Sequence, residues 1–361
     1  MTSIRPVVDQ RSPTHGEIRA AWLTDVLRSS GALHSGAVAT IATHSETSTH
    51  AQIERLTVNY TEDAVGELPA RLLVKRCAGP NFGPSEMTFY TYDYRGVADA
   101  PLPRCYAAQY QAMPQQYAII LDDLEETHCN GWQRTPTLRY AQALGAAFAA
   151  LHGVWWGRER LQAGAQPEPS AAAIARYVAH IRPGLAPLLE AVPDLAPNEV
   201  ALLHDIFAHH PRLMQERLAQ PTGWTLIHGD PNPGNILQPK TGDGPVVFID
   251  RQPFDWSLQT WLGVSDLTYA SVHWWEPEQR RALEQPLLHS YLAALHARGI
   301  TAYSGEQLWQ DYRLCAVQSM YVAVEWCVLP EDRTRMRWVW VPQLRRALAA
   351  LHDLDCAALW R

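Results

Sequence analysis

The chain has 361 residues, of which 47% are hydrophobic and 19% charged, a composition typical of a globular protein rather than a disordered one. Its formal net charge of −7 argues against a nucleic-acid partner, because nucleic-acid-binding proteins usually carry a basic patch. We expect no membrane partner either, since no apolar run approaches about 18 residues and the N-terminal residues lack the apolar core of a signal peptide.

Cysteine and histidine usage predicts neither a disulfide framework nor a zinc site. Six cysteines are widely spaced and no Cys-x-x-Cys pair occurs, which indicates reduced thiols and a cytoplasmic location. His204, His209 and His210 lie close together, but no suitably spaced partner ligands accompany them. We interpret these histidines as solvated positions of a helix.

The first part of the chain predicts one helix followed by strands. Residues 17–30 have the pattern of an amphipathic helix, which Gly31 would end. Three strand-like runs follow, with turn residues between them: Ala37–Thr43, Ile53–Tyr60 and Arg71–Arg76.

Helical patterns dominate the later part of the chain. A short helix at Ser85–Arg95 and an apolar strand at Tyr117–Leu121 precede a polar stretch. We expect Thr135 to cap the next helix, with Pro136 in its first turn. Its apolar stripe consists of Leu138, Ala141, Leu144, Phe148 and Leu151. The chain therefore predicts an α+β protein with a small strand-rich lobe at residues 1–121, a linker at 122–130 and a larger helical lobe at 131–361.

The segment His228–Asn235, with the sequence HGDPNPGN, is the strongest chemical signal. Transfer of a phosphoryl group to a hydroxyl needs a carboxylate that orients the acceptor and takes its proton, together with oxygen ligands for Mg²⁺. Asp230 and Asn235, separated by four residues, supply both from one short segment. We predict Asp230 as the catalytic residue and Asn235 as a metal ligand. The alternative is a polar turn between two strands.

A second acidic residue follows a short apolar strand. Val246–Ile249 leads directly into Asp250, and a Gly-rich turn connects this strand to the one that follows Asn235. The pattern predicts a hairpin with Asn235 and Asp250 on its two sides, where an amide oxygen and a carboxylate can share metal ions. Alternatively, Asp250 only caps the next turn.

Lysine is rare in this chain, which makes each lysine informative. Of the 30 basic residues, only Lys75 and Lys240 are lysines. Lys75 ends the run Arg71–Lys75 within a predicted strand and Glu86 opens the helix that follows, an arrangement suited to holding phosphates. An exposed strand lysine and a glutamate favoured by the helix N-terminus would give the same pattern. We interpret Lys240, in a Gly-rich turn, as solvated.

Taken together, the segments His228–Asn235 and Phe248–Gln252 resemble the aminoglycoside phosphotransferase and choline kinase superfamily, and within it the ecdysteroid-kinase-like branch. Further matching segments are Ile120–Leu124, Leu144–Trp156, Gly263–Tyr269 and Ser304–Arg313. The resemblance spans about residues 70–315.

The resemblance implies a protein-kinase-like bilobal fold, with a small antiparallel-sheet N-lobe and a mainly helical C-lobe. It also implies a Mg²⁺-dependent phosphotransferase that uses ATP or GTP and acts on an alcohol group. His228 would brace the catalytic loop. The remaining roles, matched position by position, are Asp230 as base, Asn235 and Asp250 as metal ligands, Lys75 with Glu86 for the phosphates, and the backbone of Asp122, Asp123 and Leu124 for the purine.

Several features argue against a protein kinase, the runner-up enzyme class. Asp250 is followed by Arg251-Gln252 rather than Phe-Gly, and no Ala-Pro-Glu segment follows. Only 15 residues separate Asp250 from Asp266, which leaves little room for a peptide-docking segment. The loop His44–His50 has no glycine, although its Ser/Thr-rich sequence can still present amides and hydroxyls to phosphate. A pseudokinase-like binding protein without turnover stays open as an alternative.

Charge and tryptophan content bear on the acceptor. From residue 251 onward, 12 acidic residues face 11 arginines, so no acidic excess favours a polycationic acceptor. The same stretch holds nine of the 14 tryptophans. Aromatic faces suit a sugar, a nucleoside or an antibiotic natural product, although packing of the helical core explains tryptophans as well. Our hypothesis is an uncharged or weakly charged small molecule with a hydroxyl group.

Overall fold

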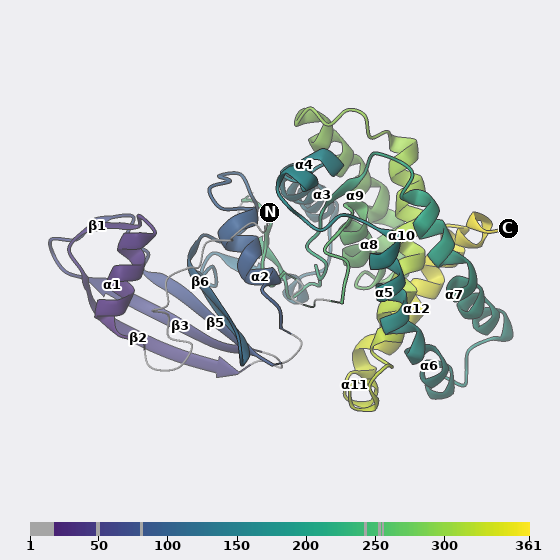
Figure 1. Ribbon diagram of the computed structural model, residues 1–361, viewed down its shortest axis with the longest axis horizontal. Coiled ribbons are helices and arrows are strands. Elements are labelled where there is room, and N and C mark those ends of the chain that lie inside the picture. The colour runs from purple at the N-terminus through teal and green to yellow at the C-terminus, as the bar shows by residue number, and fades with distance from the viewer. Residues whose placement is uncertain (1–17, 48–50, 80–81, 242–243, 252–253, 255) are drawn as a thin grey trace. The chain divides into compact units, whose positions relative to one another are not determined.

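The computed structural model describes residues 18–47, 51–79, 82–241, 244–251, 254 and 256–361 (Figure 1). The chain forms two compact units. The N-terminal unit comprises residues 1–129 together with 249–255, and the C-terminal unit comprises 130–248 and 256–361. Nothing in the sequence indicates that the segment after Phe248 belongs with the N-terminal unit.

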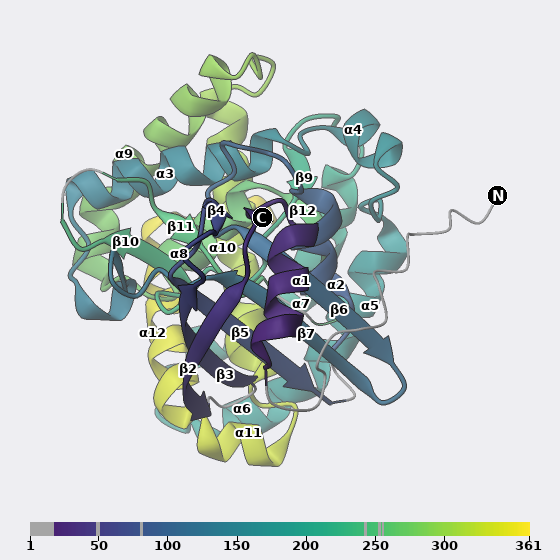
Figure 2. The same ribbon diagram turned by 90° about the vertical axis from the view of Figure 1, so that its left-hand side faces the viewer.

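A five-stranded antiparallel sheet forms the centre of the N-terminal unit, in the order β2-β3-β5-β7-β6. Figure 2 looks onto this sheet, with helix α1 crossing one face. The strands of the sheet are β2 (Val38–Thr47), β3 (Ala51–Tyr60), β5 (Arg71–Ala78), β6 (Cys105–Ala112) and β7 (Gln115–Asp122). The unit also contains α1 (Ala20–Ser29), α2 (Ser85–Thr88) and the short pair β1 (Leu33–Ser35) and β4 (Val65–Gly66).

Alternation along the strands separates two apolar clusters. Leu72 and Val74 of β5 pack with helix α1, whereas Cys77 belongs to the cluster on the other face. Because successive side chains of a strand point to opposite faces, Lys75 lies on the Cys77 side, away from α1. The alternation of side chains along β5 therefore places Lys75 on the face of the sheet opposite α1.

Some predicted elements of this unit are wrong in detail. The predicted helix Ser85–Arg95 is α-helical only over α2, and Phe89–Asp93 forms a π-helical turn. Strand β6 was not predicted. Strand β2 extends to Thr47, so the first part of the glycine-free loop is strand, and residues 48–50 of that loop lie outside the described residues.

Helices make up most of the C-terminal unit. Its short strands are β9 (Trp224–Leu226), β10 (Ile236–Pro239), β11 (Val247–Phe248) and β12 (Thr260–Leu262), and β8 (His128–Asn130) spans the unit boundary. The helices are α3 (Leu138–Gly153), α4 (Arg158–Ala163), α5 (Ala171–Ile181), α6 (Leu185–Ala191), α7 (Pro197–Arg217), α8 (Val264–Val272), α9 (Pro277–Ala297), α10 (Gly305–Glu325), α11 (Pro330–Arg335) and α12 (Arg337–Asp353).

Helix α3 crosses α9 at close range because Gly145 lacks a side chain. A Cβ at this position would lie 2.4 Å from the Leu287 carbonyl oxygen. The predicted N-cap of α3 is wrong: Thr137, not Thr135, accepts the Tyr140 amide. Leu138 was predicted to belong to the apolar stripe, yet it is 54% exposed because it lies in the first turn, ahead of the packed segment.

Two further interpretations concern histidine and cysteine. His210 is fully buried on α7, with its ring nitrogens near the Tyr321 hydroxyl (3.2 Å) and the Leu314 carbonyl oxygen (3.0 Å), so the solvated interpretation is wrong for this residue. Since Ile206 and Phe207 are also buried, helical periodicity places His210 on the buried face of α7. All six cysteines are free thiols, as predicted.

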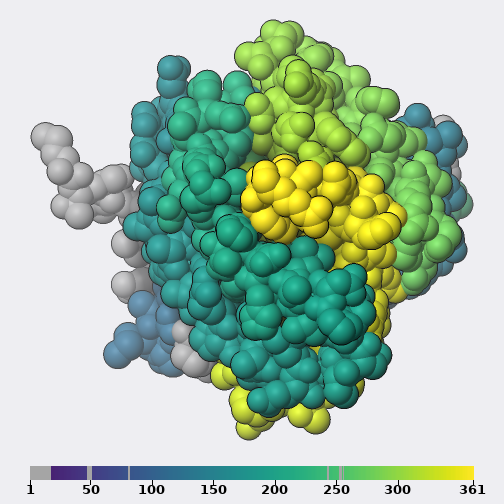
Figure 3. Space-filling model, turned by 90° about the vertical axis from the view of Figure 1, so that its right-hand side faces the viewer, coloured from purple at the N-terminus to yellow at the C-terminus, as the bar shows by residue number. Residues whose placement is uncertain are grey.

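The C-terminal end of the chain packs on the surface of its unit beside α7, shown in yellow next to teal in Figure 3. The imidazole of His209 stacks on Trp360 with ring centroids 6.4 Å apart. Arg313 of α10 donates to the Leu354 carbonyl oxygen at 2.8 Å. These contacts connect the last turn to α7 and α10.

Candidate active site

Lys75 and Glu86 form a buried ion pair in the N-terminal unit. The Lys75 ammonium lies 2.9 and 2.8 Å from the two Glu86 carboxylate oxygens. Lys75 is 7% exposed and Glu86 is fully buried. The Tyr117 hydroxyl also donates to Glu86. The pair is therefore neither an exposed lysine nor a simple helix N-terminal glutamate.

Asp250 is the second carboxylate at Lys75. The Lys75 ammonium donates to an Asp250 oxygen, while the Asp250 side chain stays 46% exposed. Burial alone would lower the pKa of Lys75, but the carboxylates of Asp250 and Glu86 outweigh it and raise the pKa above its ordinary value. Lys75 is thus a fixed cation, and Asp250 reaches solvent beside it.

The backbone around Asp250 has an uncommon conformation. Asp250 has φ = 60°, in the left-handed region, which aspartate tolerates better than most residues. The next residue, Arg251, is almost completely buried; it donates to the Ser85 hydroxyl, and its guanidinium lies 5.4 Å from the Phe89 ring centroid. Arg251 thus attaches this segment to α2, at the position where a protein kinase would have phenylalanine.

The predicted purine-contacting segment Asp122–Leu124 is partly engaged within the protein. Asp122 accepts from the Tyr106 hydroxyl at 2.6 Å, and its amide donates to the Arg104 carbonyl oxygen. The Leu124 carbonyl oxygen accepts the His128 amide at 2.8 Å. These backbone and side-chain groups therefore already have partners.

Asp123 has a structural environment of its own. Its side chain is 1% exposed and is held by Arg55 at 2.6 Å and Arg71 at 3.0 Å. One Asp123 oxygen also accepts the Glu125 amide at 3.0 Å. Two cations and a backbone donor satisfy this buried carboxylate, so the side chain shapes the turn that follows β7.

The buried carboxylate of Asp266 on α8 shapes the catalytic loop. It accepts the His228 amide at 2.6 Å and the Gly229 amide at 2.9 Å. His152 Nε2 lies 3.0 Å from the same carboxylate. Burial would raise the pKa of Asp266, but its contacts with His152 and the loop outweigh this and lower the pKa below its ordinary value. An ionised Asp266 therefore fixes the turn before Asp230.

The Asp230 carboxylate is oriented through both of its oxygens. Tyr269 of α8 donates to Oδ1 at 2.7 Å, and the side-chain amides of Asn232 and Asn235 donate to Oδ2 at 3.1 Å each. Burial raises the pKa of the Tyr269 phenol well above its ordinary value, and the Asp230 charge adds to this, so the phenol stays protonated and donates. His228 Nδ1 accepts the Asp230 amide at 3.3 Å, inside the same loop.

The predicted hairpin is present next to Asn235. Strand β10 pairs antiparallel with β11 in the register Ile236↔Phe248. Asn235 directly precedes β10, and Asp250 follows β11 by two residues along the chain. The nitrogen of the Asn235 amide also donates to the Asp230 carbonyl oxygen at 2.9 Å. The amide thus presents its nitrogen to Asp230, and its oxygen is the atom suited to a metal ion.

The predicted site residues fall into two groups, each within one unit. Lys75, Glu86 and Asp250 lie together in the N-terminal unit. Asp230 and Asn235 lie together in the C-terminal unit. In the part of the chain that the structure describes, no cluster of three or more His, Cys, Asp or Glu side chains makes a ready-made metal site. The Asp250 carboxylate and the Asn235 amide oxygen, each in its own unit, are both of the oxygen type that Mg²⁺ prefers as a ligand.

The role of Tyr269 was not predicted from the sequence, and an aromatic group lies near it. Trp256 stacks on Tyr177 and His180, with ring centroids 6.3 and 4.0 Å apart. Glu325 at the end of α10 lies 3.6 Å from His180, and its charge contributes to raising the pKa of Tyr269. We call Tyr177, His180, Trp256 and Glu325 the aromatic wall. The tryptophan excess signalled such a surface, but only the fold brings these residues together.

The fold of this chain is similar to that of proteins of known structure. No family model matches the chain, and no curated protein matches it in sequence. Among solved structures, glucosamine kinase in complex with glucosamine, ADP and inorganic phosphate has a TM-score of 0.54 at 17% identity, over 93% of this chain and 84% of that one. Spectinomycin phosphotransferase in complex with ADP and spectinomycin has a TM-score of 0.50 at 15% identity, over 92% and 99%. At such low identity the likeness shows the fold: an antiparallel-sheet N-terminal region and a helical C-terminal region, as predicted.

None of the helices in the described residues is long and apolar enough to cross a membrane.

Proposed function

We propose that this protein is a small-molecule kinase that transfers the γ-phosphoryl group of ATP or GTP to an alcohol, within the superfamily of aminoglycoside phosphotransferases and choline kinases. The observation that carries the proposal is the Asp230 carboxylate, oriented by Tyr269, Asn232 and Asn235 in a loop that Asp266 holds. The kinase fold of the structural neighbours supports it. The ecdysteroid-kinase-like branch rests on the sequence motifs alone.

In this proposal each group of the site has one task. Lys75, held by Glu86, binds the phosphates, and Asn235 and Asp250 hold Mg²⁺, which neutralises charge on the phosphates when bound. Of the Asp122–Leu124 segment, the Leu124 amide is our candidate donor to the purine, since the Leu124 carbonyl is already engaged.

Asp230 acts on the acceptor. One of its oxygens accepts the hydroxyl proton as the acceptor oxygen bonds to the γ-phosphorus and the bond to the leaving nucleoside diphosphate breaks. The hydrogen bonds from Tyr269 and Asn235 hold the carboxylate in one orientation before the acceptor arrives. Such preorganisation is where most of the catalytic gain in phosphoryl transfer lies.

The acceptor we propose is an uncharged or weakly charged hydroxylated molecule held against the aromatic wall. Trp256, which is half-buried, presents an aromatic surface to a sugar or a natural product, and the buried Tyr177 packs against it. Glu325 is the single carboxylate of the wall and lies beside His180, so the wall has no acidic excess that would favour a polycation.

A transfer screen tests this proposal. The chain is incubated with Mg²⁺ and γ-labelled ATP or GTP across neutral glycosides, nucleosides and aminoglycosides, and labelled products are separated. We expect transfer to neutral or singly charged acceptors, with a rate about 10²–10⁴-fold lower for Asp230→Asn. Absence of transfer from either nucleotide across the whole set, with nucleotide still bound, would favour the pseudokinase-like alternative.

A further inference from the structure

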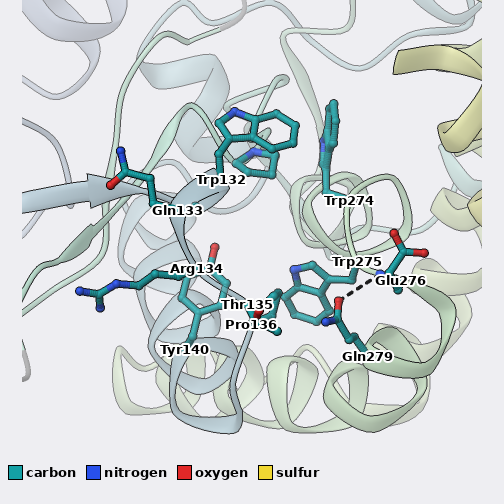
Figure 4. Close-up of a pocket in the computed structure, with 12 residues that line it drawn as sticks. Trp132, Gln133, Arg134, Thr135, Pro136, Tyr140, Trp274, Trp275, Glu276 and Gln279 are labelled. Atoms are coloured by element: carbon teal, nitrogen blue, oxygen red, sulfur yellow. Dashed lines mark hydrogen bonds between the residues drawn. The ribbon is translucent and has the colours of Figure 1, made fainter. Parts of the chain in front are cut away.

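An aromatic pocket of about 330 Å³ lies within the C-terminal unit beside the catalytic loop (Figure 4). Pro233, three residues after Asp230, forms part of its wall. The other lining residues are Gly131–Pro136, Tyr140, Trp274–Glu276 and Gln279. We call this cavity the Trp132 pocket. It shares no residue with the aromatic wall.

Trp132 is held in place although it is exposed. Its side chain is 55% exposed, and its ring meets the Trp274 ring edge-on, with centroids 5.0 Å apart at 88°. Figure 4 shows the two indoles on the same side of the pocket. An exposed indole does not contribute to core packing, and an ordered exposed aromatic surface is typical of ligand recognition.

Two glycines bring this pocket against the catalytic loop. The Gly131 amide donates to the Pro233 carbonyl oxygen at 2.7 Å, and a Cβ at Gly131 would lie 3.1 Å from Pro233. A Cβ at Gly234 would lie 3.0 Å from Trp132 Nε1. Gly234 directly precedes Asn235, so the Trp132 indole packs within one residue of the predicted metal ligand.

The charged side chains of the pocket do not favour a ligand of either charge. Arg134 donates to the Lys240 carbonyl oxygen at 2.7 Å, and Glu276 pairs with Arg346 at 2.5 Å. The two charges have opposite sign and both groups have partners. The remaining polar side chains are neutral hydrogen-bonding groups, those of Gln133, Thr135, Tyr140, Gln279 and the three tryptophans.

We propose that the Trp132 pocket binds an uncharged sugar ring. A pyranose presents a C–H face that suits an indole and hydroxyls that suit neutral amides, and the volume lies at the small end of ligand pockets, which span about 300–1,000 Å³. This assignment rests on the proposed function. The ring is a glycosyl substituent of the acceptor, and the hydroxyl that Asp230 deprotonates lies elsewhere in the acceptor.

The test is direct binding without nucleotide. Methyl β-D-glucopyranoside is titrated into the full chain labelled with ¹⁵N at the tryptophan indoles, whose resonances are assigned by single Trp→Phe variants. We expect saturable shifts of the Trp132 and Trp274 indoles, and a loss of affinity of about tenfold or more in Trp132→Ala. Trp338→Ala is the control, because Trp338 is 70% exposed on α12 and does not line the pocket.

Two outcomes overturn the proposal: no saturable shift at Trp132 or Trp274 up to about 100 mM sugar, or tighter binding of adenosine than of the sugar at these indoles. Circular dichroism confirms folding, and Trp132→Leu replaces Trp132→Ala if that variant unfolds. Sugar binding by the Asp230→Asn variant separates the two proposals. If the sugar still binds to this variant, whose turnover is strongly reduced, the pocket proposal holds independently of the proposed kinase activity. If phosphoryl transfer is found while sugar binding fails, only the pocket proposal falls.

Discussion

Replacing Asp266 by asparagine tests whether one buried carboxylate holds the catalytic loop. The carboxylate, 1% exposed, accepts the amides of His228 and Gly229 at 2.6 and 2.9 Å and contacts His152 at 3.0 Å. The asparagine side chain would keep one oxygen that accepts a hydrogen bond. Its NH₂ group would face a group that is itself a hydrogen-bond donor, so that donor would lose its acceptor. A lost charge-assisted bond plus an unsatisfied buried donor corresponds to about 2–4 kcal/mol of unfolding free energy.

The same substitution predicts a defined pH dependence. Since the folded-state pKa of Asp266 is lowered, its ionised form contributes stability that is fully present above the ordinary value of 3.8 and is lost as the pH falls through the folded-state pKa. The difference between wild type and Asp266→Asn should therefore stay constant from pH 7 down to about pH 4 and shrink below that.

Urea denaturation followed by tryptophan fluorescence measures both effects, and kcat is measured in the transfer assay. We expect kcat to fall by about 10²-fold, because small displacements of a catalytic group cost about this much. Asp332→Asn is the control, since Asp332 pairs with Arg335 on the surface of α11 and should change stability by less than about 0.5 kcal/mol. A difference at pH 7 as small as that of the control would refute the loop-holding role.

Three further predictions concern the C-terminal unit. Tyr269→Phe should lower kcat by about 10-fold with little change in nucleotide KM, because one hydrogen bond that orients the Asp230 carboxylate is lost. An unchanged kcat would contradict this prediction. Gly145→Ala should lower the unfolding free energy by about 1–3 kcal/mol, since its Cβ would meet the Leu287 carbonyl oxygen. Gly305→Ala is the control, because a Cβ there would make only an ordinary van der Waals contact with Leu292, and an equal change in both variants would contradict the prediction. Burial lowers the pKa of His210 to about 4, so the stability that its neutral form provides is complete above about pH 6.5 and is lost progressively as the pH falls from there to about 4. His210→Gln should therefore lose less stability than wild type between pH 7 and pH 5, and equal losses would be the contrary result.

The strand that carries Lys75 could be predicted from its apolar pattern, and the rarity of lysine in the chain indicated that Lys75 is a functional candidate. Lys75 follows the apolar run Leu72–Val74 inside β5, and Glu86 lies in the first turn of α2. Strand β6 escaped prediction because Cys105–Ala112 is rich in alanine and glutamine, which have little strand preference. The ring of Phe89, at the start of the π-helical turn Phe89–Asp93, packs against Arg251 from a distant part of the chain, a contact for which the local sequence carries no signal.

The catalytic loop was predictable by spacing, but its supports were not. Asp230 and Asn235 lie in one short segment, whereas Tyr269 and Asp266 approach that segment from a helix more than 30 residues later in the chain. Nothing in local periodicity distinguishes a tyrosine that bonds a catalytic carboxylate from one that packs in a core. Likewise, the boundary of α3 depends on whether Thr135 or Thr137 reaches a helix amide, and both threonines satisfy the pattern.

The proposed kinase activity depends on Asp250 belonging to a site for Mg²⁺-bound nucleotide. Calorimetry with a non-hydrolysable ATP or GTP analogue, with and without Mg²⁺, tests it in wild type and in Asp250→Ala. We expect binding that needs Mg²⁺ in wild type and is lost in Asp250→Ala, while Asp230→Asn still binds. Equal affinity of wild type and Asp250→Ala, or binding indifferent to Mg²⁺, would contradict it.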